Sequence, residues 1–157
     1  MSEEQSYLRE AIALARANIG KGGRPFGALV VRDGAVIATG VNEIHATGDP
    51  TAHAEMSAIR AASCALGSPD LGGCVVYASG HPCPMCMAAM RLAGVTGVAY
   101  AYSNEDGAPF GLSTAALYEE LARPFAEQSM DIRYLPVRPE GQPDLYAEWA
   151  QARNMQA

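Results

Sequence analysis

Long apolar runs are missing from this sequence of 157 residues. A membrane-spanning helix needs roughly 18 or more consecutive apolar residues, and the uninterrupted apolar stretches here are far shorter. The N-terminal stretch MSEEQSYLREA is polar and acidic, unlike a secretory signal peptide. We therefore expect no membrane partner, and we predict a cytoplasmic protein.

Basic charge is also scarce. Lysine and arginine together number 11 against 17 acidic residues, which gives a net charge of -6, and the basic residues are scattered along the chain. A phosphate backbone is repelled by such a protein unless its cations gather on one face. A long nucleic acid is therefore not an expected partner.

Cysteine occurs only four times. Without a secretory signal, cysteines are interpreted first as metal ligands or core residues rather than as disulfides. Cys83 and Cys86 have the spacing of metal ligands. Cys64 lies in an alanine-rich helical stretch and Cys74 in a strand-like run, where a free cysteine packs as a small apolar residue.

The composition that remains is that of a compact globular protein. Hydrophobic residues make up 49% of the chain and charged residues 18%, which is ordinary for a folded domain. The length fits one domain, and no repeat or interdomain linker is visible. We predict a single domain that spans residues 1–157.

Helical and strand-like patterns alternate along the chain. The apolar spacing and the turn signals predict helices over 6–20, 51–66, 84–92, 114–121 and 143–153, and strands over 26–32, 35–42, 74–79, 97–102 and 131–137. Asp33 and Gly34 form the dipeptide that favours a tight hairpin turn. The alternation predicts a layered α/β domain with a mixed sheet, the hairpin on one side and helices on both faces.

Potential metal ligands occur in two short stretches of the chain. His53 belongs to the first stretch, and Cys83 and Cys86 belong to the second. One imidazole and two thiolates give the three protein ligands of a catalytic zinc, whose fourth position holds water or hydroxide. The two cysteines flank a predicted helix start, where free backbone N–H groups favour thiolates. We predict one zinc ion per chain.

Glu55 follows His53 by two residues at the opening of the same predicted helix. Zinc lowers the pKa of a bound water to about 7, so the site needs a neighbouring group that takes and returns protons. A carboxylate at this position could perform that general acid–base role. We predict that Glu55 is the catalytic residue.

The two stretches are informative in combination. A lone His-x-Glu or Cys-x-x-Cys occurs in many proteins, but their order and spacing here agree with the signature of zinc deaminases. The chain resembles the cytidine-deaminase-like zinc deaminases over nearly its whole length. It is most similar to the bacterial guanine deaminases, through Pro25-Phe26-Gly27-Ala28, Val41-Asn42, the stretch from Asp49 to Glu55, Ala58-Ile59-Arg60 and Pro82-Cys83-Pro84-Met85-Cys86.

This resemblance implies a three-layer α/β/α sandwich with a mixed five-stranded sheet, assembled as a homodimer. It also implies that Asn42 hydrogen-bonds the base, that Phe26 walls the pocket and that the backbone at Ala54 lies against the reacting ring. The residues alone leave other interpretations open. An asparagine after a strand is often a turn residue, although its amide can match a base edge, and a phenylalanine is more often part of the core.

The sequence departs from the family pattern in two places. His81 lies just before the second metal stretch, where relatives commonly carry an acid, and it either approaches the metal or caps a loop. Ser113 and Thr114 stand where the bacterial guanine deaminases place an acid before a helix. Asp106 or Glu148 could supply a carboxylate instead, or both are ordinary surface acids.

Three functions therefore compete. The first is hydrolytic deamination of a free purine-like base, with guanine, which gives xanthine and ammonia, as the first candidate. The second keeps the chemistry but acts on cytosine, an aminotriazine or a transfer-RNA adenosine, and the acidic charge disfavours the RNA substrate. The third is a noncatalytic zinc-binding module, which would need a fourth protein ligand such as His81.

Overall fold

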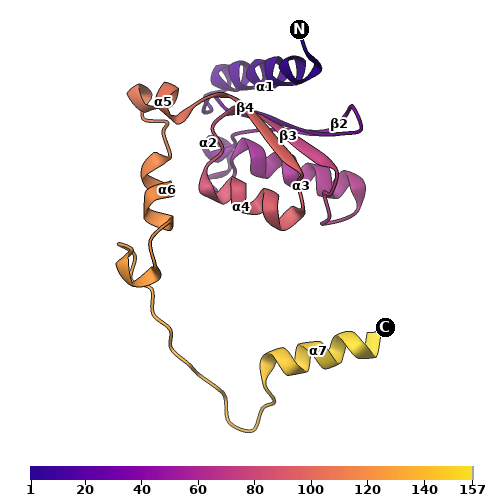
Figure 1. Cartoon of the computed structure of the whole chain (residues 1–157), viewed down its shortest axis with the longest axis vertical. Coiled ribbons are helices and arrows are strands. Elements are labelled where there is room, and N and C mark those ends of the chain that lie inside the picture. The colour runs from indigo at the N-terminus through magenta and orange to yellow at the C-terminus, as the bar shows by residue number, and fades with distance from the viewer. Residues whose placement is uncertain (157) are drawn as a thin grey trace. The chain divides into compact units, whose positions relative to one another are not determined.

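The computed structural model describes residues 1–156 and contains two compact units, one ending at Arg123 and the other beginning at Pro124 (Figure 1). The first unit holds the sheet and most of the helices. The second holds a 3-10 helix, η2 (Phe125–Glu127), and the helix α7 (Leu145–Gln156). The expectation of one domain over the whole chain stays a prediction.

A mixed four-stranded sheet forms the centre of the first unit. Strand β1 runs antiparallel to both β2 and β3, and β3 runs parallel to β4, so the order across the sheet is β2-β1-β3-β4. The mixed sheet predicted from the sequence is confirmed. The strands are β1 (Gly27–Arg32), β2 (Ala35–Val41), β3 (Cys74–Gly80) and β4 (Gly97–Tyr102).

Helices cover both faces of this sheet, as Figure 1 shows. The long helix α1 packs on one face, where Ala11 meets Leu29, Val31 and Tyr77. Helices α3 and α4 pack on the other face, so the predicted three-layer arrangement is confirmed. The helices of this unit are α1 (Glu3–Gly20), α2 (Ile44–Thr47), α3 (Ala54–Leu66), α4 (Pro84–Ala93), α5 (Asn104–Gly107), the 3-10 helix η1 (Ala108–Phe110) and α6 (Ala115–Leu121).

Helix α3 lies very close to β2 at Gly40. A Cβ atom at this glycine would lie 2.5 Å from the backbone nitrogen of Ala58 and would also meet the carbonyl oxygen of Ala54. A residue without a side chain is therefore required for the helix to pack this closely on the strand. The close packing fixes the first turn of α3, which carries Glu55, against the sheet.

The β1–β2 hairpin turns at the predicted dipeptide. Asp33 and Gly34 have φ angles of 51° and 75°, and positive φ at both central residues is what a two-residue hairpin turn with the right twist requires. The turn places β1 between β2 and β3 in the middle of the sheet. The hairpin prediction is confirmed in its position.

The fifth predicted strand, over residues 131–137, is not formed. This segment has no regular structure, and its side chains Tyr134, Leu135 and Val137 are exposed. A strand exists only through hydrogen bonds to a neighbour, and no strand of the described residues pairs with this segment. Pro136 also lacks the N–H that a ladder would use. The sheet therefore has four strands instead of five.

No helix within residues 1–156 is both long enough and apolar enough to cross a membrane.

Candidate active site

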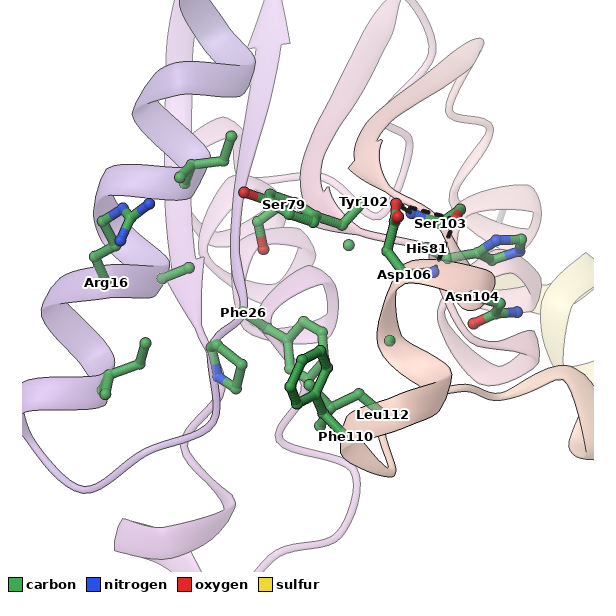
Figure 2. A pocket seen from close by; sticks show the side chains of 16 residues that line it. Arg16, Phe26, Ser79, His81, Tyr102, Ser103, Asn104, Asp106, Phe110 and Leu112 are labelled. Carbon is green, nitrogen blue, oxygen red and sulfur yellow. Dashed lines mark hydrogen bonds between the residues drawn. The ribbon is translucent and has the colours of Figure 1, made fainter.

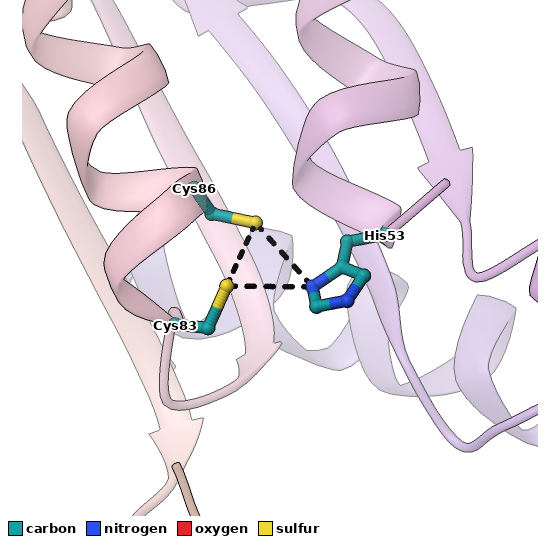
Figure 3. A group of neighbouring side chains, drawn as sticks. All are labelled: His53, Cys83 and Cys86. Atoms are coloured by element: carbon teal, nitrogen blue, oxygen red, sulfur yellow. Dashed lines mark hydrogen bonds between the residues drawn. The ribbon is translucent and has the colours of Figure 1, made fainter. Parts of the chain in front are cut away.

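The three predicted metal ligands lie together between the starts of two helices (Figure 3). His53 is the N-cap residue of α3, Cys83 is the N-cap residue of α4, and Cys86 lies in the first turn of α4. The Nδ1 atom of His53 lies 3.4 Å from the Sγ atom of Cys83 and 3.7 Å from that of Cys86, and the two sulfurs are 3.6 Å apart.

These distances fit a tetrahedral zinc ion. Zinc–sulfur bonds of about 2.3 Å and zinc–nitrogen bonds of about 2.0 Å at tetrahedral angles require ligand atoms about 3.5 to 3.8 Å apart. The distances observed between His53, Cys83 and Cys86 match that spacing. The sulfurs are free thiols rather than a disulfide, whose S–S length would be about 2.05 Å.

Local interactions set where α3 begins. The Asp49 carboxylate accepts hydrogen bonds of 2.8 Å from both the backbone nitrogen and the hydroxyl of Thr51. This turn keeps the chain out of the helical conformation through His53, whose φ and ψ angles are -73° and 157°. The helix predicted from residue 51 therefore begins at Ala54, and the His53 imidazole projects toward the cysteines.

The pKa values of the three side chains in the cluster favour binding of a cation. The hydrogen bond between the two thiol groups lowers the pKa of Cys83 to about 4, and the same contact together with burial raises the pKa of Cys86. A hydrogen bond with Cys83 raises the pKa of His53. The cluster therefore places negative charge on the Cys83 sulfur. A metal ion displaces the protons that remain on the cluster when it binds.

Glu55 is buried beside the cluster, with 5% of its surface exposed. Burial raises the pKa of this carboxyl above its ordinary value, because the charged form loses hydration. A carboxyl group whose pKa is shifted toward neutrality is well suited both to accept and to return a proton. The predicted general acid–base residue therefore has a fitting environment.

A cavity of about 140 Å³ brings the predicted site residues together. It is lined by every residue that the sequence placed in the site except Cys86, which is fully buried. The roles of these residues remain predictions. The lining residues are Arg24, Phe26, Asn42, His53, Ala54, Glu55, His81, Cys83, Gly111, Leu112, Ser113 and Thr114.

Asn42 contributes a buried amide to the cavity wall. Only 2% of its surface is exposed, and its side-chain oxygen accepts a hydrogen bond of 3.2 Å from the backbone nitrogen of Ile44. Its NH2 group forms no hydrogen bond within residues 1–156. Asn42 therefore acts as a turn residue through its side-chain oxygen, which was one of the interpretations considered from the sequence. Its NH2 group remains as a hydrogen-bond donor for a ligand.

Asn18, near the end of α1, fixes the backbone around this wall. Its buried side-chain nitrogen donates to the carbonyl oxygens of Arg24 and Asn42, both at 2.8 Å. The Arg24 carbonyl also accepts a hydrogen bond of 2.8 Å from the backbone nitrogen of Phe26. One buried amide therefore links the two cavity-lining segments that precede β1 and follow β2.

Arg24 is the main residue that sequence reasoning missed. It is exposed and lines the cavity, but isolated cations without a cluster gave no signal in the sequence. Its one distinguishing mark is its position directly before the Pro25-Phe26 pair. Gly111 and Leu112 were missed as well, because they lie between the predicted strand over 97–102 and the predicted helix over 114–121 and belong to no motif.

His81 and the alternative acids, Asp106 and Glu148, lie in different parts of the structure. His81 lines the cavity and packs against Tyr100 and Tyr118, with ring centroids 4.8 and 5.5 Å away, and the metal-binding group among the described residues does not include it. The Asp106 carboxylate accepts hydrogen bonds from the backbone nitrogen and hydroxyl of Ser103 at 2.8 and 3.0 Å.

Asp106 lines a second, larger cavity of about 560 Å³ rather than the one beside the cluster (Figure 2). Figure 2 shows its carboxylate turned toward Ser103. Glu148 is exposed and lies on α7 in the second unit. Within the described residues, Glu55 is thus the only carboxylate that lines the smaller cavity.

Comparison with known proteins agrees with this geometry. Residues 1–102 match the family described as cytidine and deoxycytidylate deaminase zinc-binding region. The chain is 41% identical over 127 residues to a guanine deaminase of Bacillus subtilis (strain 168), which covers 80% of this chain and 81% of the relative. It is 36% identical over 97 residues to a tRNA-specific adenosine deaminase of Aquifex aeolicus (strain VF5), covering 62% and 64% of the two chains.

Solved structures show the same likeness. An X-ray structure of guanine deaminase from Bacillus subtilis superposes with a TM-score of 0.84 at 36% identity and covers 96% of this chain and 93% of that one. A structure of guanine deaminase from Nitrosomonas europaea gives a TM-score of 0.66 at 30% identity, with 69% and 64% covered.

Proposed function

Because this chain belongs to the family defined by the cytidine and deoxycytidylate deaminase zinc-binding region, we propose that it hydrolyses guanine to xanthine and ammonia. The chain is a zinc-dependent hydrolase that acts on a nucleobase. One observation carries the proposal: the His53, Cys83 and Cys86 group adjoins a cavity that is also lined by a buried carboxyl, at Glu55, and by the amide of Asn42, whose NH2 group forms no hydrogen bond among the described residues.

The reaction requires protons to move at a carbon that loses its amino group. When bound by His53, Cys83 and Cys86, zinc supplies the Lewis acidity that makes water nucleophilic near pH 7. Glu55 accepts a proton from the attacking water as the new C–O bond forms at C2 of guanine. It delivers that proton to the ring nitrogen beside C2. It then takes the second proton from the new hydroxyl on C2 and passes it to the amino group, so the C–N bond breaks, ammonia leaves and C2 becomes a carbonyl carbon.

Three further residues hold the base in this proposal. The NH2 group of Asn42, which forms no hydrogen bond among the described residues, donates to an acceptor of the ring. The backbone at Ala54 lies beside the reacting carbon, and Phe26 forms an apolar wall. The ring of Phe26 packs on Gly80, where a Cβ atom would lie 2.9 Å from the ring, so the position of this wall is fixed by the sheet.

The competing functions have less support. A transfer-RNA adenosine is favoured by the Aquifex aeolicus relative, but the net charge of -6 opposes phosphate binding. A noncatalytic zinc module would need four protein ligands, whereas the group among the described residues offers three. Cytosine and aminotriazines remain substrates to be compared with guanine.

We expect the zinc-loaded protein to release ammonia from guanine with the highest kcat/KM of a parallel panel. The panel contains guanine, cytosine, adenine, the corresponding nucleosides and aminotriazines, and ammonia is measured by a coupled assay. Typical enzymes reach kcat/KM values of about 10⁴ M⁻¹s⁻¹ or more with their own substrates. Faster turnover of any other base than of guanine would reject the guanine assignment while leaving the deaminase chemistry intact.

We also propose that the protein is a homodimer in the cytoplasm. Strand β4 ends the sheet with one edge unpaired among the described residues, and such an edge favours association with another chain. Its Tyr100 and Tyr102 side chains are exposed. Light scattering after size-exclusion chromatography at micromolar concentration should give twice the 16.5 kDa mass, and a monomer mass would reject the dimer.

The cytoplasmic location rests on the cysteines. The four free cysteines fit a reducing compartment, and cell fractionation tests this location.

A further inference from the structure

The cavity beside the metal cluster offers an unusual set of polar groups. Glu55, the only carboxylate in its lining, is assigned to proton transfer. Two further lining residues carry hydrogen-bond donors, namely Arg24 with its guanidinium and Asn42 with an NH2 group that forms no hydrogen bond among the described residues. Ser113 and Thr114 contribute only hydroxyls. The wall that faces a bound base is therefore suited to a ligand edge that carries acceptors.

Arg24 is available for this role. It forms no ion pair among the described residues, and arginine gains most from a planar partner that accepts two hydrogen bonds. Its backbone is held in place because its carbonyl oxygen accepts from Asn18 and from the backbone nitrogen of Phe26. The side chain is thus carried by an anchored segment that adjoins the aromatic wall.

The nucleobases differ in the edge that they present to such a donor pair. Guanine carries two adjacent acceptors, O6 and N7, whereas adenine pairs an N7 acceptor with an N6 donor, and cytosine exposes an N4 donor. The amino group of guanine lies on C2, on the opposite edge of the purine. A guanine with C2 at the reacting centre therefore leaves the N7 side free to meet donors.

We propose that Arg24 is a specificity-determining residue that reads the O6 and N7 acceptors of guanine, with Asn42 as the second donor. This inference rests on the proposed function. Arginine forms its most frequent specific base contact with these two acceptors, through a bidentate pair of hydrogen bonds. The contact replaces recognition through an acidic residue, which this chain lacks at Ser113 and Thr114.

The test compares enzyme variants with substrates that each lose one acceptor. 7-Deazaguanine has no N7 acceptor and 2-aminopurine has no O6, while both keep the amino group on C2. We expect Arg24→Gln to lower kcat/KM for guanine by about 10-fold or more, mainly through a higher KM. The same variant should lower kcat/KM for each modified base by less than about threefold. Each of these bases lacks one of the two acceptors, so the wild-type arginine cannot form both hydrogen bonds with it.

Two further variants sharpen the comparison. Arg24→Lys keeps the charge but not the planar fork, so its loss on guanine should approach that of Arg24→Gln. Lys21→Gln removes an exposed cation three residues away that lines neither cavity, and it should leave kcat/KM unchanged. Guanosine monophosphate is included, since an arginine could also bind a phosphate.

Each other result overturns the inference. An equal loss on all bases would mean that Arg24 acts on the fold or the overall charge, and no loss would mean that it does not contact the base. A loss confined to guanosine monophosphate would assign Arg24 to phosphate binding. If the wild-type protein releases no ammonia from guanine, the proposed function fails separately. Calorimetric binding of guanine and 7-deazaguanine to wild type and Arg24→Gln then decides the inference by the same comparison.

Discussion

Replacing Glu55 with glutamine is expected to lower kcat by about 10² to 10⁴-fold while the protein still binds zinc. The amide is nearly the same size as the carboxyl, but it cannot take a proton from water or return one to the ring. Glu55 is the only carboxylate among the described residues that line the cavity, so no neighbouring carboxylate can replace it. Single-turnover ammonia release and metal analysis of the same preparation measure the two quantities.

Glu43→Gln is the matched control for this experiment. Glu43 is exposed and lies outside the cavity lining, so its kcat should equal that of the wild type. Near-normal turnover in the Glu55→Gln variant would show that another group transfers the proton. Loss of zinc in that variant would instead show that Glu55 is needed to hold the metal.

Removing a sulfur ligand is expected to abolish both zinc binding and activity. Cys86→Ser replaces a fully buried thiolate ligand with a hydroxyl, which binds zinc poorly at neutral pH. Zinc content should fall from one ion per chain to near zero, with deamination at background. The melting temperature should drop too, because a ligand present at 1,000 times its Kd stabilises the native state by about 4 kcal/mol.

Cys64→Ser provides the control, since Cys64 is an exposed free cysteine on α3 outside the cluster. It should keep its zinc and its activity. A strong chelator should reproduce the loss in the wild type, and added zinc should restore turnover. Full activity in the Cys86→Ser variant, or in the chelated wild-type protein, would remove Cys86 and zinc from the mechanism.

Local features of the sequence predicted much of this architecture. The hairpin at Asp33 and Gly34 was predictable because the turn depends on the φ angles of two adjacent residues. The cluster was predictable because Cys83 and Cys86 lie one helical turn apart and His53 starts a helix. Each of these features depends on residues that are close together in the sequence, so a single sequence is enough to predict it.

Features that depend on distant partners were not predictable. Residues 131–137 have the composition of a strand, but the identity of a strand's neighbour is not encoded in its own residues. Arg24 was missed for a similar reason, since its place in the cavity depends on the Asn18 side chain, which comes from another helix. The start of α3 was misplaced by three residues because the Asp49 side chain competes with the helix.

The two proposed tasks of the site, hydrolysis and recognition of the base, involve different kinds of structural element. His53 and Cys83 cap helices that pack on the sheet, whereas Arg24 and Thr114 belong to connecting segments. Connecting segments tolerate substitution better than packed elements. Substitutions in these segments can therefore change base preference while the metal ligands and Glu55 keep their positions. For protein engineering, a library restricted to residue 24 and residues 111–114 would sample new substrates while leaving the means of deamination untouched.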